Sequence, residues 1–161
     1  MNAPNPADQA ADHPGVITPP PVIYGTGLIA GALIDLAQPL PLATDPTRWI
    51  IGVILIALGL ALAISSTSRF RRAGTNVQPH KPSTTVVTTG IYAVSRNPIY
   101  LGLTALYVGL AFVANTWWAV ILLPAVLITM RYGVIAREER YLEAKFGDAY
   151  TTYKARVRRW L

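Results

Sequence analysis

Residues 49–68 read WIIGVILIALGLALAISSTS, a run of 20 residues without a charged side chain. Arg48 and Arg69 bound this run. At a rise of about 1.5 Å per residue, a helix of this length crosses about 30 Å, which is the thickness of the hydrocarbon layer of a bilayer. A helix buried in a soluble core rarely runs this long without a charge. The segment therefore predicts a membrane span.

A second charge-free stretch predicts a helical hairpin. The 34 uncharged residues between Arg96 and Arg131 are too many for one span. Asn-Thr at residues 115–116 lies midway and is followed by two tryptophans, which favour a membrane interface. We predict a tight turn there, between spans over residues 98–114 and 117–136.

Residues 22–38 predict the first span, which ends in a proline-broken turn. It contains Asp35, which is either a polar site inside the membrane or a residue at the far interface, and the proline that follows favours the second interpretation. Residues 1–21 are rich in proline, alanine and aspartate and predict a disordered tail. Residues 22–161 then form a single domain, so the expected fold is an all-α polytopic membrane protein with about four transmembrane helices.

The amino-acid composition excludes several classes of protein and of functional site. Only 14% of the 161 residues are charged, which argues against an ordinary soluble enzyme. No cysteine is present, which excludes disulfide scaffolds, thiolate metal sites and cysteine nucleophiles, and two histidines offer little for a metal site. The net charge of +6 indicates membrane orientation and anionic lipid headgroups rather than nucleic acid.

The basic residues are concentrated in the loop at residues 70–97 and in the tail at residues 137–160, whereas the opposite side has only Arg48. The positive-inside rule then places both termini, the loop and the tail in the cytoplasm. In the tail, apolar and aromatic residues recur on one helical face, which predicts amphipathic helices at the interface; this face comprises Leu142, Phe146, Tyr150, Tyr153, Val157 and Trp160.

Two polar features stand out on this cytoplasmic side. Asn97 and Pro98 predict a helix start, where Arg96 and the helix dipole would favour an anion. A plain capped helix with a snorkelling arginine is the alternative. Glu138 and Glu139 lie at the inner end of a span, where a basic residue would better match the helix dipole. They therefore imply a positively charged partner, which is Arg131, Arg137 or a cationic ligand.

Two motifs occur in the polar segments. The first is Gly-x-Tyr-x-x-x-Arg-Asn-Pro-x-Tyr at residues 90–100, and the second is Glu-Glu-x-x-Leu-x-x-x-Phe-Gly-x-x-Tyr-x-x-Tyr at residues 138–153. With these two motifs the sequence resembles the isoprenylcysteine carboxyl methyltransferase family, which belongs with the phospholipid methyltransferases among integral-membrane enzymes. The similarity extends over residues 69–157.

The resemblance implies methyl transfer from S-adenosylmethionine to a lipophilic acceptor that arrives from the bilayer. It also implies cofactor contacts at Gln78, Thr84, Thr85, Val86, Val87, Tyr92, Asn97, Pro98, Ile99, Tyr100 and Glu138. Arg96 and Glu139 belong to the same motifs and are further candidates for the catalytic site. No metal ion is implied.

Two positions depart from the family pattern. Asn97 stands where histidine is more usual, and both side chains can form hydrogen bonds. Val134 stands where the prenylcysteine enzymes have an arginine that contacts the substrate carboxyl group, and Arg131, one turn earlier, is the candidate to replace it. Two other functions remain open: a sterol-type membrane reductase that uses NADPH, and a four-helix transporter or scaffold without catalysis.

Overall fold

The structure is a computed structural model that describes residues 13–77 and 81–161. Its elements in chain order are α2 (Pro20–Ala37), α3 (Thr47–Arg72), the 3-10 helix η1 (Gly90–Ala93), α4 (Pro98–Ala114), α5 (Trp117–Met130), the π-helical turn η2 (Arg131–Ile135), α6 (Ala136–Phe146) and α7 (Asp148–Arg156). The described residues form helices and loops but no strands, which confirms the predicted all-α class.

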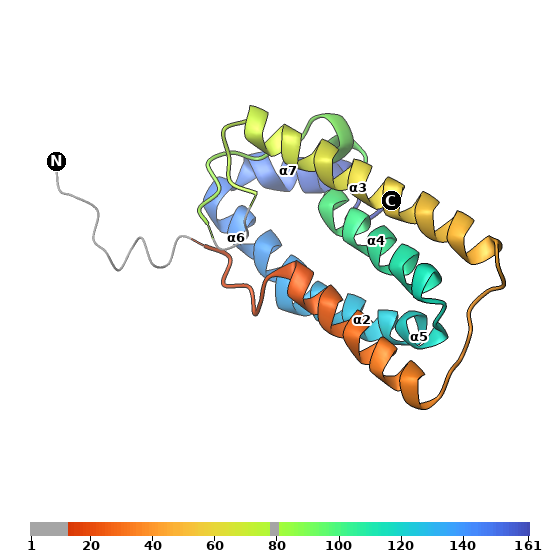
Figure 1. Cartoon of the computed structure of the whole chain (residues 1–161). Coiled ribbons are helices and arrows are strands. Elements are labelled where there is room, and N and C mark those ends of the chain that lie inside the picture. Colours follow the sequence, from red (N-terminus) through yellow and green to blue (C-terminus); the bar gives the residue numbers. More distant parts are fainter. Residues whose placement is uncertain (1–12, 78–80) are drawn as a thin grey trace.

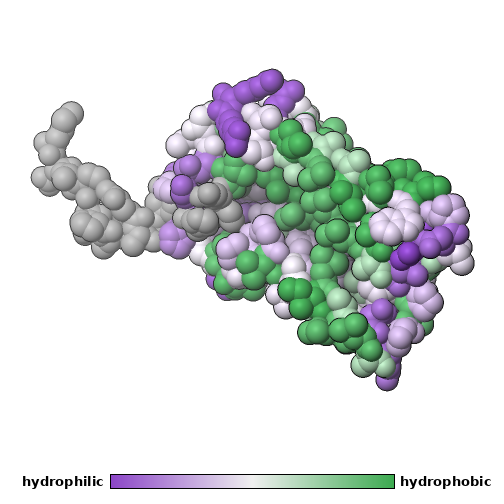
Figure 2. All heavy atoms as spheres, in the orientation of Figure 1, coloured by the Kyte–Doolittle hydropathy of each residue, from purple (hydrophilic) through white to green (hydrophobic). Residues whose placement is uncertain are grey.

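Three helices are long and apolar enough to cross a membrane: α2, α3 and the continuous helix Trp117–Phe146, which combines α5, η2 and α6. The predicted hairpin is present, since α4 ends at Ala114 and α5 begins at Trp117. Helix α4 is also apolar, but it has only 17 residues, so the fourth span stays a prediction. Hydrophobic side chains cover the middle of the molecular face in Figure 2, and hydrophilic side chains gather toward its ends.

The helices pack in two close pairs, α3 against α4 and α2 against α5 (Figure 1). Glycine permits both contacts. A Cβ atom on Gly59 of α3 would lie 2.6 Å from the carbonyl oxygen of Gly102 on α4, and one on Gly31 of α2 would lie 2.7 Å from the amide nitrogen of Ala119 on α5. Small residues at such crossings let the helix backbones approach closely, which favours association where no hydrophobic effect operates between spans.

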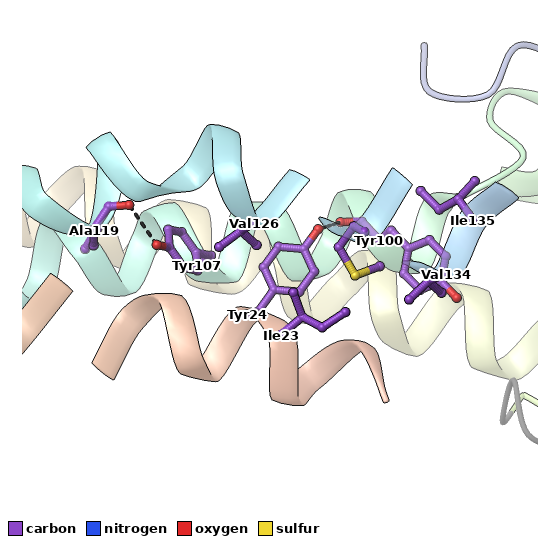
Figure 3. Close-up of a cluster of buried hydrophobic side chains, with 10 residues drawn as sticks. Ile23, Tyr24, Tyr100, Tyr107, Ala119, Val126, Val134 and Ile135 are labelled. Atoms are coloured by element: carbon purple, nitrogen blue, oxygen red, sulfur yellow. Dashed lines mark hydrogen bonds between the residues drawn. The ribbon is translucent and has the colours of Figure 1, made fainter. Parts of the chain in front are cut away.

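Tyrosines join the two pairs inside the bundle (Figure 3). The Tyr107 hydroxyl of α4 donates a hydrogen bond of 2.7 Å to the carbonyl oxygen of Ala119 on α5. The Tyr24 ring of α2 packs edge-on against Tyr107, and its hydroxyl lies 2.8 Å from the Thr104 hydroxyl. The hydroxyl groups of Tyr24 and Tyr107 therefore find partners inside the bundle, where water is absent.

The hairpin tip is fastened to the loop between α2 and α3. Asn115 ends α4 with a left-handed backbone, at φ 57°. Its Oδ1 atom accepts hydrogen bonds from the amides of Leu42 (3.0 Å) and Ala43 (2.9 Å). The indole nitrogen of Trp118 donates to the carbonyl oxygen of Gln38 at 2.7 Å. One side chain thus fixes both the turn and the neighbouring loop.

Asn115→Ala is expected to lower the free energy of unfolding by about 2 kcal/mol, because two backbone amides lose their acceptor and alanine resists a positive φ. Asn115→Gly loses the same hydrogen bonds but tolerates the backbone, so we expect a loss of about 1 kcal/mol. Denaturant unfolding in mixed micelles measures both. Equal losses in the two variants would show that the left-handed backbone adds nothing.

The chain before α2 differs from the predicted tail over residues 1–21. Residues 1–12 lie outside the described residues, but the segment from residue 14 onward packs on the bundle, and α2 already begins at Pro20. Proline suits the first turn of a helix, because no partner is needed for its missing amide hydrogen. Asp35 accepts a hydrogen bond from the amide of Leu40 at 3.1 Å, so it stabilises the turn after α2, which favours the interface interpretation.

Candidate functional site

A pocket lies at one end of the bundle, where the loop before α4, the start of α4, α6 and α7 meet. In Figure 1 this is the end at which α6 and α7 are labelled. Its lining comprises Pro14, Phe70, Asn76, Val77, Ser83, Thr85, Val86, Val87, Tyr92, Arg96, Asn97, Pro98, Ile99, Tyr100, Glu138, Glu139, Tyr141, Leu142, Tyr150 and Tyr153.

Most of the predicted site residues lie together in this pocket, although the loop and the glutamates are about 40 positions apart along the chain. Thr84 is an exception: it is exposed, and its hydroxyl donates to the carbonyl oxygen of Gly74 at 3.1 Å. Gln78 and His80 lie outside the described residues. Arg131 lies elsewhere, as described below. The structure therefore brings the two predicted motifs to one place.

Glu138 and Tyr100 connect the two sides of the pocket. The Tyr100 hydroxyl on α4 donates a hydrogen bond of 2.6 Å to Oε1 of Glu138 on α6. This short hydrogen bond orients the carboxyl group of Glu138 within the pocket. Its second oxygen, Oε2, has no partner among the residues described and can accept a hydrogen bond from a ligand.

Glu139 links two arginines from other segments of the chain beside the pocket. It is only 7% exposed. Arg159 binds it with two hydrogen bonds, from Nε to Oε1 at 2.9 Å and from Nη2 to Oε2 at 2.6 Å. Arg96 adds an ion pair from Nη2 to Oε1 at 3.2 Å. We name these three residues the arginine clasp, and it joins α6 to the start of α4 and to the C-terminal segment.

Arg96 has spare hydrogen-bonding capacity. Its side chain is only 8% exposed, and Nε and Nη1 are buried without a hydrogen-bond partner in the part of the chain that the structure describes. An unpaired buried donor is costly, and a guanidinium group matches the geometry of a carboxylate. Because Arg96 lines the pocket, these two donors indicate a place for an anionic group of a ligand.

The start of α4 was predicted correctly in position but not in detail. Asn97 precedes the helix and Pro98 is its first residue, yet the Asn97 side chain makes no capping bond. Instead, Nδ2 donates to the carbonyl oxygen of Arg159 at 2.9 Å. The amide of Ile99, which lines the pocket at the positive end of the helix, has no hydrogen-bond acceptor among the described residues.

Tyrosines form much of the remaining wall. The hydroxyl of Tyr153 on α7 donates to the carbonyl oxygen of Tyr92 at 2.7 Å, and the Tyr92 ring packs against Phe70 at 5.2 Å between centroids. Burial raises the pKa of Tyr153 to about 12 and also raises the pKa values of Tyr92 and Tyr150. All three phenols are therefore neutral near pH 7 and contribute aromatic faces to the wall.

Arg131 lies at a second hollow, an apolar groove between α4 and the long helix. Leu101, Thr104, Leu127, Ile128 and Trp160 complete its lining, and we name it the apolar groove. The Arg131 guanidinium lies over the Tyr132 ring, 5.6 Å from its centroid. The structure thus does not place Arg131 with the glutamates and Arg96.

Several lining residues were not singled out from the sequence. Tyr150 and Tyr153 were assigned to a lipid-facing surface, yet both are buried in the pocket wall. Their presence in the second motif was a signal that could have identified them. For Arg159 no such signal exists, because its contact with Glu139 spans 20 positions and depends on the path of the C-terminal segment.

Residues 47–149 match the model of the phospholipid methyltransferase family, which is more than half of the chain. The chain belongs to the phospholipid methyltransferase family. The matched residues include α3, the loop, α4, α5 and the carboxyl groups of α6. They therefore lie on both sides of the pocket in this family of membrane methyltransferases.

Two relatives show partial similarity. The chain is 35% identical over 72 residues to a protein-S-isoprenylcysteine O-methyltransferase of Schizosaccharomyces pombe, covering 45% of this chain and 30% of that protein. It is 74% identical over 27 residues to an uncharacterized protein of Haemophilus influenzae, covering 17% of this chain and 43% of that protein. The chain thus spans less than half the length of each relative. No solved structure is significantly similar to it.

Proposed function

We propose that this protein transfers a methyl group from S-adenosylmethionine to a lipophilic acceptor at the cytoplasmic face of a membrane. The observation that carries the proposal is the pairing of opposite charges in one pocket. Within residues 13–77 and 81–161, one oxygen of the Glu138 carboxyl group and two buried donors of Arg96 have no hydrogen-bond partner.

This pairing fits a zwitterionic amino acid group. Glu138 would bind an ammonium group or ribose hydroxyls, while Arg96 and the amide of Ile99 would bind a carboxylate. The Tyr92 and Tyr100 rings would flank an adenine ring or face a positively charged sulfur. S-Adenosylmethionine supplies an activated methyl group bonded to that sulfur. The chain's own contribution is to hold donor and acceptor in line and to exclude water.

The apolar groove supports a lipophilic acceptor. Four of its six residues are hydrocarbon or indole side chains, and Arg131 is its one basic residue. An amphiphile whose tail remains in the bilayer could lie along such a surface, with Arg131 near an acidic group of the acceptor. Val134 is fully buried, so it does not take over this role.

The basic residues support the cytoplasmic orientation. Arg69, Arg71 and Arg72 lie in the last turn of α3, and Lys154 and Arg156 lie in the last turn of α7. Both turns are at the pocket end of the bundle (Figure 1). Under the positive-inside rule this end faces the cytoplasm, and its charge would attract anionic lipid headgroups.

Isothermal titration of the purified protein in detergent tests the cofactor. We expect S-adenosylmethionine and S-adenosylhomocysteine to bind and NADPH not to bind. Binding of NADPH alone would support a reductase instead, and binding of none of the three would favour a scaffold or transporter. If S-adenosylmethionine binds, a screen of lipid extracts with a labelled methyl donor would identify the acceptor.

A further inference from the structure

The segment Pro14–Ile17, before α2, reaches the pocket from a part of the chain outside both family motifs. Pro14 is one of the pocket-lining residues. Val16 packs against the buried core. In Figure 1 the described N-terminal segment runs past α6 before α2 begins. We name this segment the N-terminal strap; its Pro14 forms part of the pocket wall, next to the helix that carries Glu138.

Two hydrogen bonds, one from a backbone amide and one from a side chain, attach the strap to the long helix. The amide of Ile17 donates to the carbonyl oxygen of Gly133, in the π-helical turn, at 3.1 Å. Nη1 of Arg137 donates to the carbonyl oxygen of Gly15 at 2.7 Å. Arg137 directly precedes Glu138, so the strap is fixed beside the pocket carboxylate.

Gly133 is the residue that makes room for this attachment. A Cβ atom at position 133 would lie 2.3 Å from Cδ1 and 2.8 Å from Cγ1 of Ile17, closer than atoms can approach. The Ile17 side chain therefore covers a surface that only glycine offers. A larger residue at position 133 forces the end of the Ile17 side chain to turn aside, so the strap loses this side-chain contact with the helix.

The attachment is nevertheless slight. Apart from the packing of Val16 against the core, the described contacts of the strap with the long helix are two hydrogen bonds and the contact of Ile17 with Gly133, and Ile17 remains 53% exposed. Arg137 keeps a buried Nε without a partner in the described part of the chain, so its hold on the strap does not use its full hydrogen-bonding capacity. A segment with few buried contacts opens at low free-energy cost compared with the packed helices around it.

We propose that the N-terminal strap is a removable wall of the cofactor pocket, and that Gly133 and Arg137 are the positioning residues that seat it. The closed strap retains a bound S-adenosyl compound, and the open strap lets it exchange. The inference rests on the proposed function, because the retained ligand is the cofactor named there.

Because the chain has no cysteine, a single introduced thiol can report the strap position. Pro14→Cys in the full chain would be reacted with a water-soluble thiol reagent in detergent. We expect saturating S-adenosylhomocysteine to slow labelling about fivefold and Gly133→Ala to accelerate it about threefold without ligand. Ala144→Cys, at an exposed position of α6 away from the pocket lining, is the control and should react at one rate throughout.

Dissociation of labelled S-adenosylhomocysteine gives a second readout on the cysteine-free chain. Gly133→Ala should accelerate it about fivefold, and the double variant Gly133→Ala/Ile17→Ala should restore a slower rate, because the clashing atoms are removed while the backbone bond remains. Arg137→Leu acts at the other attachment and should also accelerate dissociation.

The outcomes separate the two proposals. If S-adenosylhomocysteine binds but neither labelling nor dissociation changes in the Gly133 and Arg137 variants, the strap is a fixed part of the fold and this inference is overturned. If the wild-type chain does not bind S-adenosylhomocysteine, the proposed function fails first, and retention by the strap fails with it.

Discussion

Glu138→Gln is expected to weaken the binding of S-adenosylhomocysteine about 100-fold, because a buried carboxylate loses its charge while its shape is preserved. The amide can still accept the hydrogen bond that Tyr100 donates, so the link between α4 and α6 should survive. Isothermal titration in detergent measures the affinity, and an unchanged unfolding midpoint shows that the fold is intact.

Tyr100→Phe provides the matched comparison. It removes the hydrogen bond to Glu138 but keeps the carboxylate, so we expect a smaller loss of affinity, about tenfold. If Glu138→Gln binds S-adenosylhomocysteine as tightly as the wild type, the pocket carboxylate does not contact the ligand, and the charge pairing on which the proposed function rests is refuted.

The second large effect is expected at Glu139. Glu139→Ala leaves Arg96 and Arg159 without their shared partner, and breaking a buried ion pair from one side costs about 3 kcal/mol of unfolding free energy. Denaturant unfolding in mixed micelles measures this loss. The ligand should also bind less tightly, because the same carboxylate holds Arg96 in place at the pocket.

Glu143→Gln is the control for the clasp. Glu143 lies one turn further along α6 and pairs with Lys154, but both side chains are about one third exposed. Water and salt weaken such pairs, so we expect a loss below about 1 kcal/mol. Comparable losses at Glu139 and Glu143 would mean that the arginine clasp stabilises the fold no more than a surface pair does.

The membrane elements were predictable because their signals are local. Charge-free length marked the spans, and Asn115 with Thr116 marked the turn between α4 and α5, where the structure places it. Asn97 and Pro98 likewise marked the start of α4. The turn and helix-start patterns act within one or two helical turns, and each charge-free run lies within one continuous segment of the chain. The surrounding fold therefore does not alter them.

The partners of polar side chains were not predictable in the same way. Helical periodicity places Tyr150 and Tyr153 on one face of α7, but it does not say whether lipid or a pocket covers that face. Asn97 was expected to cap its own helix, and it bonds to Arg159 instead, 62 positions away. Such contacts depend on how the C-terminal segment crosses the start of α4, which only the tertiary structure determines.

The π-helical turn determines which residues of α6 face the pocket. Along α5, the row of inward residues Leu123, Val126 and Met130 would continue to Arg137 in an uninterrupted α-helix. The extra residue of a π turn shifts the following helix by about 100°. Glu138 therefore takes the inward position that Arg137 would otherwise occupy, so one continuous helix presents apolar side chains to the bundle and a carboxyl group to the pocket.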